Sequence, residues 1–313
     1  MVGLILSITF WIGFVRLMST LASIVTFIIN HFKQPLDLKS RYGENSWAVI
    51  TGGANGIGGA TAKKLAKQGF NIYIWDKDEK AIADIESSIK DINSEVKVTA
   101  VHKDLSKGDG ISFYRELYEE VKDLDVSILI NNVSIITFKM PHTNPGSLFS
   151  EMLKLNVILP AMLSSLFIKK LLAREKKSAI ITMSSCVGAY PSPPENIFTA
   201  TKAFSRFLGL GLAEEFRDKI DCQTVCHGLV KTDMIKGYTL DDAVTPEFAA
   251  DYELNKLGIV EETSASATQE ILVYGPVLSI YYCSLELFYY VDANLIWKRF
   301  AEEMKLGEDS YLP

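Results

Sequence analysis

The chain has 313 residues, 48% of them hydrophobic, which is enough for one large α/β domain with appended segments. With a formal net charge of -6 and no basic stripe interleaved with aromatic residues, the composition gives no basis for nucleic-acid binding. The four cysteines and four histidines show no metal-ligand spacing, so we expect no metal site and favour a reducing compartment.

The first predicted element is an apolar segment from Leu4 to Ile29 that contains a single charge, Arg16. About 20 apolar residues suffice to cross a bilayer. The segment shows no clear positive start, short apolar core or small-residue cleavage site of a signal peptide. We therefore predict that residues 1–32 form a retained membrane anchor, in which Arg16 snorkels, pairs with a partner, or marks the break of a shallow hairpin.

Basic residues follow this segment and do not precede it. Lys33, Lys39 and Arg41 come directly after the anchor, whereas the residues before it include no Lys or Arg. The positive-inside rule therefore places the folded domain on the cytoplasmic or matrix side of a membrane.

The stretch SWAVITGGANGIGGATAKKLAKQGFNIYIWDKD, residues 46–78, carries the sharpest pattern in the chain. WAVIT and FNIYIW are typical of buried strands, and ATAKKLAKQG is typical of a helix that ends at Gly69. Gly52 permits a tight turn, Gly56 lets the backbone approach a pyrophosphate, and Gly58 opens a helix whose amides favour that anion. The pattern predicts a Rossmann-type βαβ unit that binds a dinucleotide.

Asp76 ends the second of these strands. A carboxylate at this point can accept hydrogen bonds from both hydroxyls of an adenosine ribose, whereas a 2′-phosphate would meet like charge. We therefore expect NAD(H) in preference to NADP(H), although the neighbouring Lys77 softens that preference.

The motif TGGANGIG, from Thr51 to Gly58, resembles the glycine-rich signature of the short-chain dehydrogenase/reductase family, and the likeness extends to about Met234. Further matches occur in the family's order: VHKDLS, ILINN, KLNVILP, IITMSS and TATKAF. The resemblance implies a doubly wound parallel sheet. It also implies dinucleotide contacts from Thr51, Gly52, Asn55, Gly56, Ile57, Gly58, Asp76, Asp104, Asn131, Lys202 and Thr232.

Within that family, the chain is most similar to the membrane-bound ketoacyl reductase and 17β-hydroxysteroid dehydrogenase branch. The resemblance implies three catalytic residues, Asn156, Ser185 and Lys202. Ser185 would donate a hydrogen bond to a reacting carbonyl, and Lys202 would hold the nicotinamide ribose and lower the pKa of a neighbouring phenol. Because Pro160 has no amide hydrogen, the Asn156 carbonyl should lack its helical partner and be able to hold a relay water.

The phenol itself is missing. The family's pattern is Tyr-x-x-x-Lys, but Phe198 stands four residues before Lys202. Phe keeps the shape of Tyr without the acid/base hydroxyl, and general acid catalysis typically contributes about 10² to 10⁴-fold. Thr199 points about 100° away around the helix and cannot substitute. Tyr190, in the preceding loop, is a candidate replacement.

Two smaller departures from the family pattern occur: Ser134 in place of a Gly, and His227 in place of a Pro. After Met234 the likeness fades, and no seventh strand is evident. We place the domain boundary at residue 262 and assign residues 263–313 to an aromatic extension. Its core, Ile271 to Val291, is equally consistent with a membrane element, a protein contact and a buried helix.

Two functions remain open. The one we favour is a membrane-anchored pseudoenzyme that binds NAD(H) and serves as a structural or regulatory subunit of a membrane protein assembly; it rests on Phe198, Arg16 and the aromatic segment Ile271 to Val291. The alternative is an active oxidoreductase on a hydrophobic alcohol or carbonyl, such as a fatty acyl, steroid or retinoid group; it rests on Asn156, Ser185 and Lys202. The resemblance implies the endoplasmic reticulum, whereas a mitochondrial inner membrane would suit a non-catalytic subunit.

Overall fold

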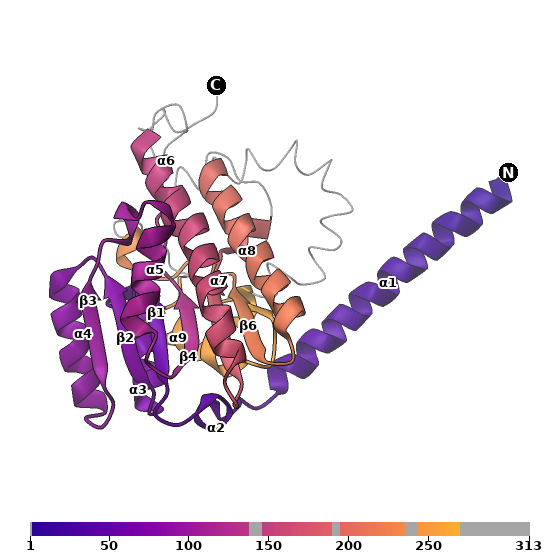
Figure 1. Ribbon diagram of the computed structural model, residues 1–313. Helices are drawn as coiled ribbons and strands as arrows, with labels where there is room; N and C mark the ends of the chain where they lie inside the picture. The colour runs from indigo at the N-terminus through magenta and orange to yellow at the C-terminus, as the bar shows by residue number, and fades with distance from the viewer. Residues whose placement is uncertain (1, 138–145, 190–194, 236–242, 270–313) are drawn as a thin grey trace.

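The computed structural model describes residues 2–137, 146–189, 195–235 and 243–269. Helix α1 (Val2–Phe32) extends away from a single α/β domain (Figure 1). The helix is continuous across Arg16, so the alternative of a hairpin break at this residue is wrong. The segment Ile271 to Val291 lies outside the described residues.

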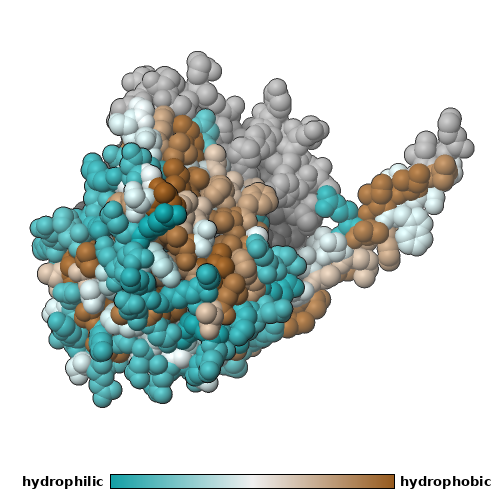
Figure 2. All heavy atoms as spheres, in the orientation of Figure 1, coloured by the Kyte–Doolittle hydropathy of each residue, from teal (hydrophilic) through white to brown (hydrophobic). Residues whose placement is uncertain are grey.

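Two stretches of the described chain are long and apolar enough to cross a membrane. Ser7–Phe32 has none of its most apolar window buried, whereas 44% of the window of Gly146–Leu172 is buried inside the domain. Figure 2 shows apolar residues along α1 and over the face near α7 and α8, and polar residues over the opposite side near α4. Because Gly146–Leu172 belongs to the core, α1 is the candidate membrane anchor.

The domain is built on seven parallel strands in the order β3-β2-β1-β4-β5-β6-β7, which confirms the predicted doubly wound sheet. The order reverses between β1 and β4, where such sheets place their ligands. The strands are β1 (Trp47–Thr51), β2 (Asn71–Asp76), β3 (Val98–His102), β4 (Val126–Asn131), β5 (Ser178–Met183), β6 (Ile220–Val225) and β7 (Glu262–Thr263).

Helices cover both faces of this sheet (Figure 1). Side chains alternate between faces along a strand, so Ala48 and Ile50 pack with one helix layer while Val49 packs with the other. The first layer comprises α2 (Leu38–Tyr42), α3 (Gly56–Lys67), α4 (Glu79–Ile92) and α9 (Pro246–Lys256). The second comprises α5 (Gly110–Val121), α7 (Leu159–Leu172) and α8 (Asn196–Phe216), with α6 (Gly146–Leu153) preceding α7.

The first βαβ unit forms where the sequence predicts it. β1 and β2 are buried strands, and their apolar runs account for this. Helix α3 is followed by Gln68 and then Gly69, whose φ of 91° lies in the left-handed region that a C′ glycine adopts at low cost.

The seventh strand corrects the sequence prediction. β7 pairs with Thr224 and Val225 of β6, so the expectation that no seventh strand is present is wrong. A strand of two residues is too short to produce a periodic pattern. The next residues, Ser264 and Ala265, are buried as well, so the domain core continues past residue 262.

The anchor joins the domain at the amino-terminal edge of the sheet. The Lys256 ammonium of α9 donates hydrogen bonds to the carbonyls of Asn30 and His31, at 2.8 and 3.2 Å, where a cation suits the negative end of α1. Nearby, Arg41 of α2 donates two hydrogen bonds to Asp221 near the start of β6. α1 is therefore attached at the edge opposite to the one where parallel strands place a ligand.

Candidate functional site

A pocket of about 570 Å³ lies at the carboxyl ends of the strands. It is lined by residues that follow β1, β2, β4, β5 and β6, together with the beginning of α8. This location is the crevice expected for a ligand of a doubly wound sheet. We call the part around Gly52, Gly56 and Asp76 the nucleotide end, and the part around Ser185, Phe198 and Lys202 the catalytic end.

The nucleotide end contains a backbone turn that only glycine fits. Gly52 and Gly56 have φ values of 64° and 54°, in the left-handed region. A Cβ atom on Gly58 would lie 2.3 Å from the carbonyl oxygen of Gly52. The side-chain amide of Asn132 donates to the carbonyls of Thr51 and Gly52, at 3.0 and 2.7 Å, and holds the turn in place. The turn and the following helix terminus fit a pyrophosphate.

Asp76 borders the same end of the pocket. Its carboxylate accepts hydrogen bonds from the backbone amides of Ala54 and Asp78, at 3.0 and 3.1 Å. These contacts fix the carboxylate next to the glycine turn, where an adenosine ribose would lie. Lys77 and Lys103 also line this part of the pocket, so both signs of charge are present.

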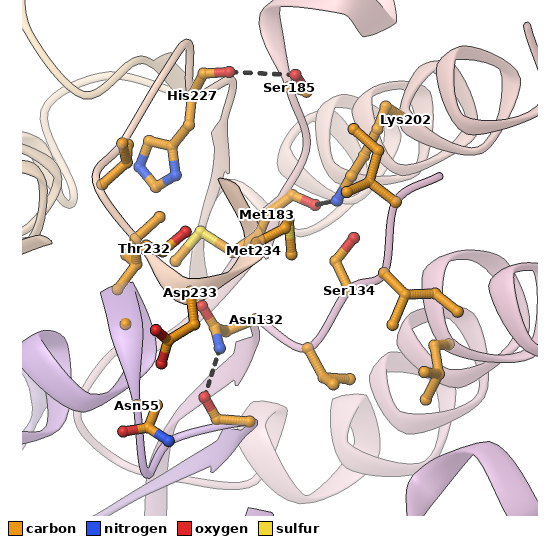
Figure 3. Close-up of a pocket in the computed structure, with 18 of the residues that line it drawn as sticks. Asn55, Asn132, Ser134, Met183, Ser185, Lys202, His227, Thr232, Asp233 and Met234 are labelled. Atoms are coloured by element: carbon orange, nitrogen blue, oxygen red, sulfur yellow. Dashed lines mark hydrogen bonds between the residues drawn. The ribbon is translucent and has the colours of Figure 1, made fainter. Parts of the chain in front are cut away.

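Ser185 and Lys202 face the catalytic end from β5 and α8 (Figure 3). The Ser185 hydroxyl donates to the carbonyl of His227 at 3.2 Å. The Lys202 ammonium donates to the carbonyl of Met183 at 3.1 Å and lies 5.6 Å from the ring centroid of Phe198. Burial lowers the pKa of Lys202 to about 8. An ammonium so placed can hold a ribose hydroxyl.

The backbone of Asn156 differs from the prediction. It lies in a π-helical turn, Lys154–Ile158, in which the amide of Leu159 donates to the carbonyl of Lys154. The Asn156 carbonyl accepts a hydrogen bond from the Ser205 hydroxyl at 2.9 Å. Pro160 has no amide to donate to this carbonyl, as the sequence predicts, but a side chain of α8 takes the place of that partner, so the carbonyl already accepts one hydrogen bond.

The side chain of Asn156 holds the loop after β4. Its Oδ1 accepts from the amide of Ile135 at 3.0 Å and from the hydroxyl of Ser134 at 3.1 Å, and its amide donates to the carbonyl of Ile135 at 3.0 Å. Asn156 is buried and does not line the pocket. In this structure it orders the wall of the site.

Phe198 is buried at the edge of the catalytic end, where its ring lines the pocket. Thr199 is also buried but does not line the pocket, as its position on the helix predicts. Tyr190 lies outside the described residues.

The structure brings most of the predicted site residues together. Four of the predicted site residues do not line the pocket but support the segments that form it: Thr51, Gly58, Asn131 and Asn156. Thr51 Oγ1, for example, donates to the carbonyl of Ile130 and accepts from the amide of Asn132, which links β1 to β4. The predicted residues that do line the pocket are Gly52, Asn55, Gly56, Ile57, Asp76, Asp104, Ser185, Lys202 and Thr232, with Phe198 among them.

Among the pocket residues that the sequence did not predict, three bear on the chemistry: Asn132, His227 as a partner of Ser185, and Glu195. Asn132 is the second residue of the motif already quoted for Asn131, so its position gave a signal. Glu195 immediately precedes the helix that carries Phe198 and Lys202, but nothing in its spacing indicates that the carboxyl is buried.

A model of the short chain dehydrogenase family matches residues 46–243. Among curated proteins, the chain is 30% identical over 226 residues to the very-long-chain 3-oxoacyl-CoA reductase-A of Danio rerio, covering 70% of this chain and 69% of that protein. It is 29% identical over 230 residues to the very-long-chain 3-oxoacyl-CoA reductase of Macaca fascicularis, covering 71% and 72%.

Solved structures show the same fold. A 7β-hydroxysteroid dehydrogenase matches with a TM-score of 0.67 and 21% identity over 79% of this chain and 99% of its own. A short-chain dehydrogenase from Sphingobium yanoikuyae, solved in complex with NADPH, matches with a TM-score of 0.63 and 23% identity over 71% and 88%.

Proposed function

Because the chain belongs to the short-chain dehydrogenase family, we propose that it is a membrane-anchored NAD(P)(H)-dependent oxidoreductase for the carbonyl or alcohol group of a hydrophobic substrate. One observation carries the proposal: the glycine turn, Ser185 and Lys202 line one continuous pocket. A dinucleotide held by the turn would place its nicotinamide near Lys202, next to the serine hydroxyl.

The residues of the chain divide the chemistry between them. A bound reduced nicotinamide supplies a hydride, and the carbonyl that accepts it develops negative charge on oxygen. Ser185 can turn its hydroxyl from the His227 carbonyl towards that oxygen and stabilise the charge. Lys202 holds the ribose and adds a positive charge nearby.

The lining of the pocket supports an apolar substrate. Ile135, Leu155, Met183, Val187 and Met234 line it together with the polar groups. The curated relatives are named for 3-oxoacyl-CoA thioesters with very long chains, which carry a ketone on an apolar chain. We infer a fatty acyl ketone as the first class to test and a steroid ketone as the second.

Asp76 supports NAD(H) as the preferred cofactor. Its carboxylate is held beside the glycine turn by two backbone amides, so it cannot easily withdraw from a 2′-phosphate. Lys77 and Lys103 reduce the repulsion without removing it. NADPH binding at lower affinity is the expected result.

The apolar helix α1 supports attachment to a membrane, with the domain on the side of Lys33. Acyl chains and steroids partition into bilayers, so a membrane-held enzyme would meet them at high local concentration. The endoplasmic reticulum and the mitochondrial inner membrane are the two membranes to examine.

Phe198 supports a second candidate function, that of a catalytically impaired NAD(H)-binding protein acting as a subunit of a membrane assembly. The ring is buried beside Lys202 and brings no hydroxyl to the pocket. The two candidates share cofactor binding and differ only in turnover.

The test uses the full chain in detergent micelles or nanodiscs. NADH and NADPH are titrated by fluorescence, and NADH oxidation is followed with a series of 3-oxoacyl-CoA thioesters and steroid ketones. Saturable NADH oxidation supports the oxidoreductase. Tight NADH binding without turnover of any substrate, followed by turnover in Phe198→Tyr, supports the impaired protein. If neither dinucleotide binds, both candidates are wrong.

A further inference from the structure

The catalytic end holds a carboxyl group that none of these assignments uses. Glu195 occupies the position immediately before α8, and its carbonyl accepts the amide of Thr199. Its side chain lines the pocket that Phe198 and Ser185 also line, and only 6% of the residue is exposed. Glu195 precedes Phe198 by three positions, and the two residues line the same pocket.

The Glu195 carboxyl forms no capping interaction, hydrogen bond or ion pair with the residues that the structure describes. It makes no side-chain capping bond to α8, although Asp, Asn, Ser and Thr commonly do so at this position. No hydrogen bond or ion pair joins it to any of the residues that the structure describes. Burial raises the pKa of Glu195 to about 7, so a large share of the group is protonated near neutrality.

Two of the neighbouring titratable groups are poorly suited to giving up a proton to a substrate. Besides Glu195, the titratable groups that line the same pocket are Asp76, Lys77, Lys103, Asp104, Glu151, Cys186, Lys202, His227 and Asp233. Burial raises the pKa of the Cys186 thiol, which makes it a weaker acid. The imidazole of His227 is turned to Glu253, with Nε2 at 3.1 Å from its carboxylate, and only its carbonyl contacts Ser185.

We propose that Glu195 is the proton donor of this site and takes the place of the hydroxyl that Phe198 lacks. The proposal rests on the proposed oxidoreductase function. Glu195 directly precedes the helix that carries Phe198, and both line the pocket, so a carboxylic acid can reach the region from which a phenol would have acted. Like a phenol at neutral pH, it is a hydrogen-bond donor when protonated.

The step balances as follows. The substrate carbon accepts a hydride with its electron pair from the reduced nicotinamide, and the π pair of the carbonyl moves onto oxygen. That oxygen takes the proton of the Glu195 carboxyl, and the O–H bond of the acid breaks. The products are the alcohol, the oxidised dinucleotide and the Glu195 carboxylate, which regains a proton from solvent. In alcohol oxidation the carboxylate accepts the proton instead.

Glu195→Gln tests the donor directly, because it keeps the shape of the side chain and removes the acid. We expect kcat for carbonyl reduction to fall by roughly 100- to 10,000-fold while the NADH affinity stays the same. Glu215→Gln is the matched control, since Glu215 is exposed on the same helix and outside the pocket. Its kcat should stay within about twofold of the wild type, as for most surface substitutions.

A second variant separates loss of the acid from damage to the fold. Glu195→Gln combined with Phe198→Tyr places a phenol one helical turn from Lys202, and we expect it to recover activity. In parallel, carboxyl-labelled glutamate is followed by ¹³C NMR in the protein without dinucleotide, with Glu195→Gln assigning the resonance. That resonance should titrate near neutrality.

These experiments test the oxidoreductase function and the role of Glu195 separately. Suppose that the wild type reduces a substrate and Glu195→Gln keeps the same rate, or that the rate is lost only in Tyr190→Phe. Either result would show that Glu195 is not the proton donor, while the proposed oxidoreductase function would be retained. A Glu195 resonance that titrates at the ordinary value for Glu also contradicts the donor. If the wild type binds NADH but reduces no substrate, the proposed oxidoreductase function is wrong. The assignment of Glu195 as its proton donor is then wrong as well.

Discussion

The two ends of the pocket differ in how closely their residues follow the sequence pattern of the short-chain dehydrogenase family. At the nucleotide end, the glycine turn matches the signature quoted for the family, and the backbone geometry tolerates no other residue at Gly58. At the catalytic end, the positions of Ser185 and Lys202 are kept while the phenol is replaced by Phe198. The residues expected to bind the dinucleotide are thus retained, whereas the tyrosine expected to donate the proton is not.

This difference shows that shape and proton chemistry can change independently. A phenyl ring fills nearly the space of a phenol, so the substitution leaves the packing around Lys202 undisturbed. The acid function can then pass to any group that reaches the same space with a suitable pKa. Glu195 meets both conditions. Four variants test whether substitutions at one end of the pocket leave the properties of the other end unchanged.

Gly58→Ala should have the largest effect and act on the nucleotide end alone. The new Cβ would lie 2.3 Å from the carbonyl oxygen of Gly52, so the turn must open. We expect the Kd for NADH to rise about a thousandfold, which corresponds to about 4 kcal/mol. Fluorescence titration measures the Kd, and circular dichroism checks the fold. Gly211→Ala is the control, because nothing lies within 4 Å of its Cβ position; unchanged binding in both variants would contradict the assignment of the turn.

Glu195→Gln should change how stability depends on pH. The pKa of Glu195 rises from 4.5 in the unfolded chain to about 7 in the folded chain. Between these values the folded state binds more protons, so its free energy of unfolding falls as pH rises. Relative to the variant, the wild type should lose on the order of 3 kcal/mol between pH 4.5 and 7. Chemical denaturation across this range measures the difference, and parallel curves would show that Glu195 titrates normally.

Asp76→Ser should alter the choice of cofactor rather than the ability to bind one. Removing the carboxylate relieves repulsion of a 2′-phosphate and takes away an acceptor for the ribose hydroxyls. We expect the preference for NADH over NADPH to fall by about tenfold, equal to about 1.4 kcal/mol. Paired titrations of both dinucleotides give the ratio. An unchanged ratio would mean that Asp76 serves only the amides of Ala54 and Asp78.

Ser205→Ala should have the smallest effect, at the catalytic end. The substitution removes the hydrogen bond to the carbonyl of Asn156 inside the core. A lost hydrogen bond of this kind costs about 1 kcal/mol in the free energy of unfolding. Ser88→Ala is the control, because its hydroxyl donates to the carbonyl of Asp84 within the same exposed helix. Equal denaturation midpoints for the two variants would show that the bond to Asn156 contributes nothing.

The parts of the fold that could be predicted are those with local signals. The βαβ unit follows from long apolar runs, a glycine turn and a C′ glycine, all within residues 46–78. Helix α9 also has such signals, a Thr245 cap whose hydroxyl accepts from the amide of Phe248 and Pro246 at its first position. These signals are local and lie beyond Met234, where the likeness to the family has faded.

The remaining features depend on contacts between distant residues. Ser205 and Asn156 are 49 positions apart, and His227 meets Glu253 across 26 positions. No periodicity or motif encodes such pairings. The burial of Glu195 is of the same kind, because the pocket that it lines is formed by segments from many parts of the chain.

The central claim is that this chain transfers hydride to a substrate although Phe198 stands at the tyrosine position. The most direct measurement uses NADH that carries deuterium at both C4 positions of the nicotinamide, together with a long-chain 3-oxoacyl-CoA. The product alcohol is analysed by mass spectrometry. We expect one deuterium at the new carbinol carbon with the wild type, and none with Gly58→Ala. Absence of deuterium with the wild type, despite measured NADH binding and deuterium transfer by Phe198→Tyr, would contradict the claim.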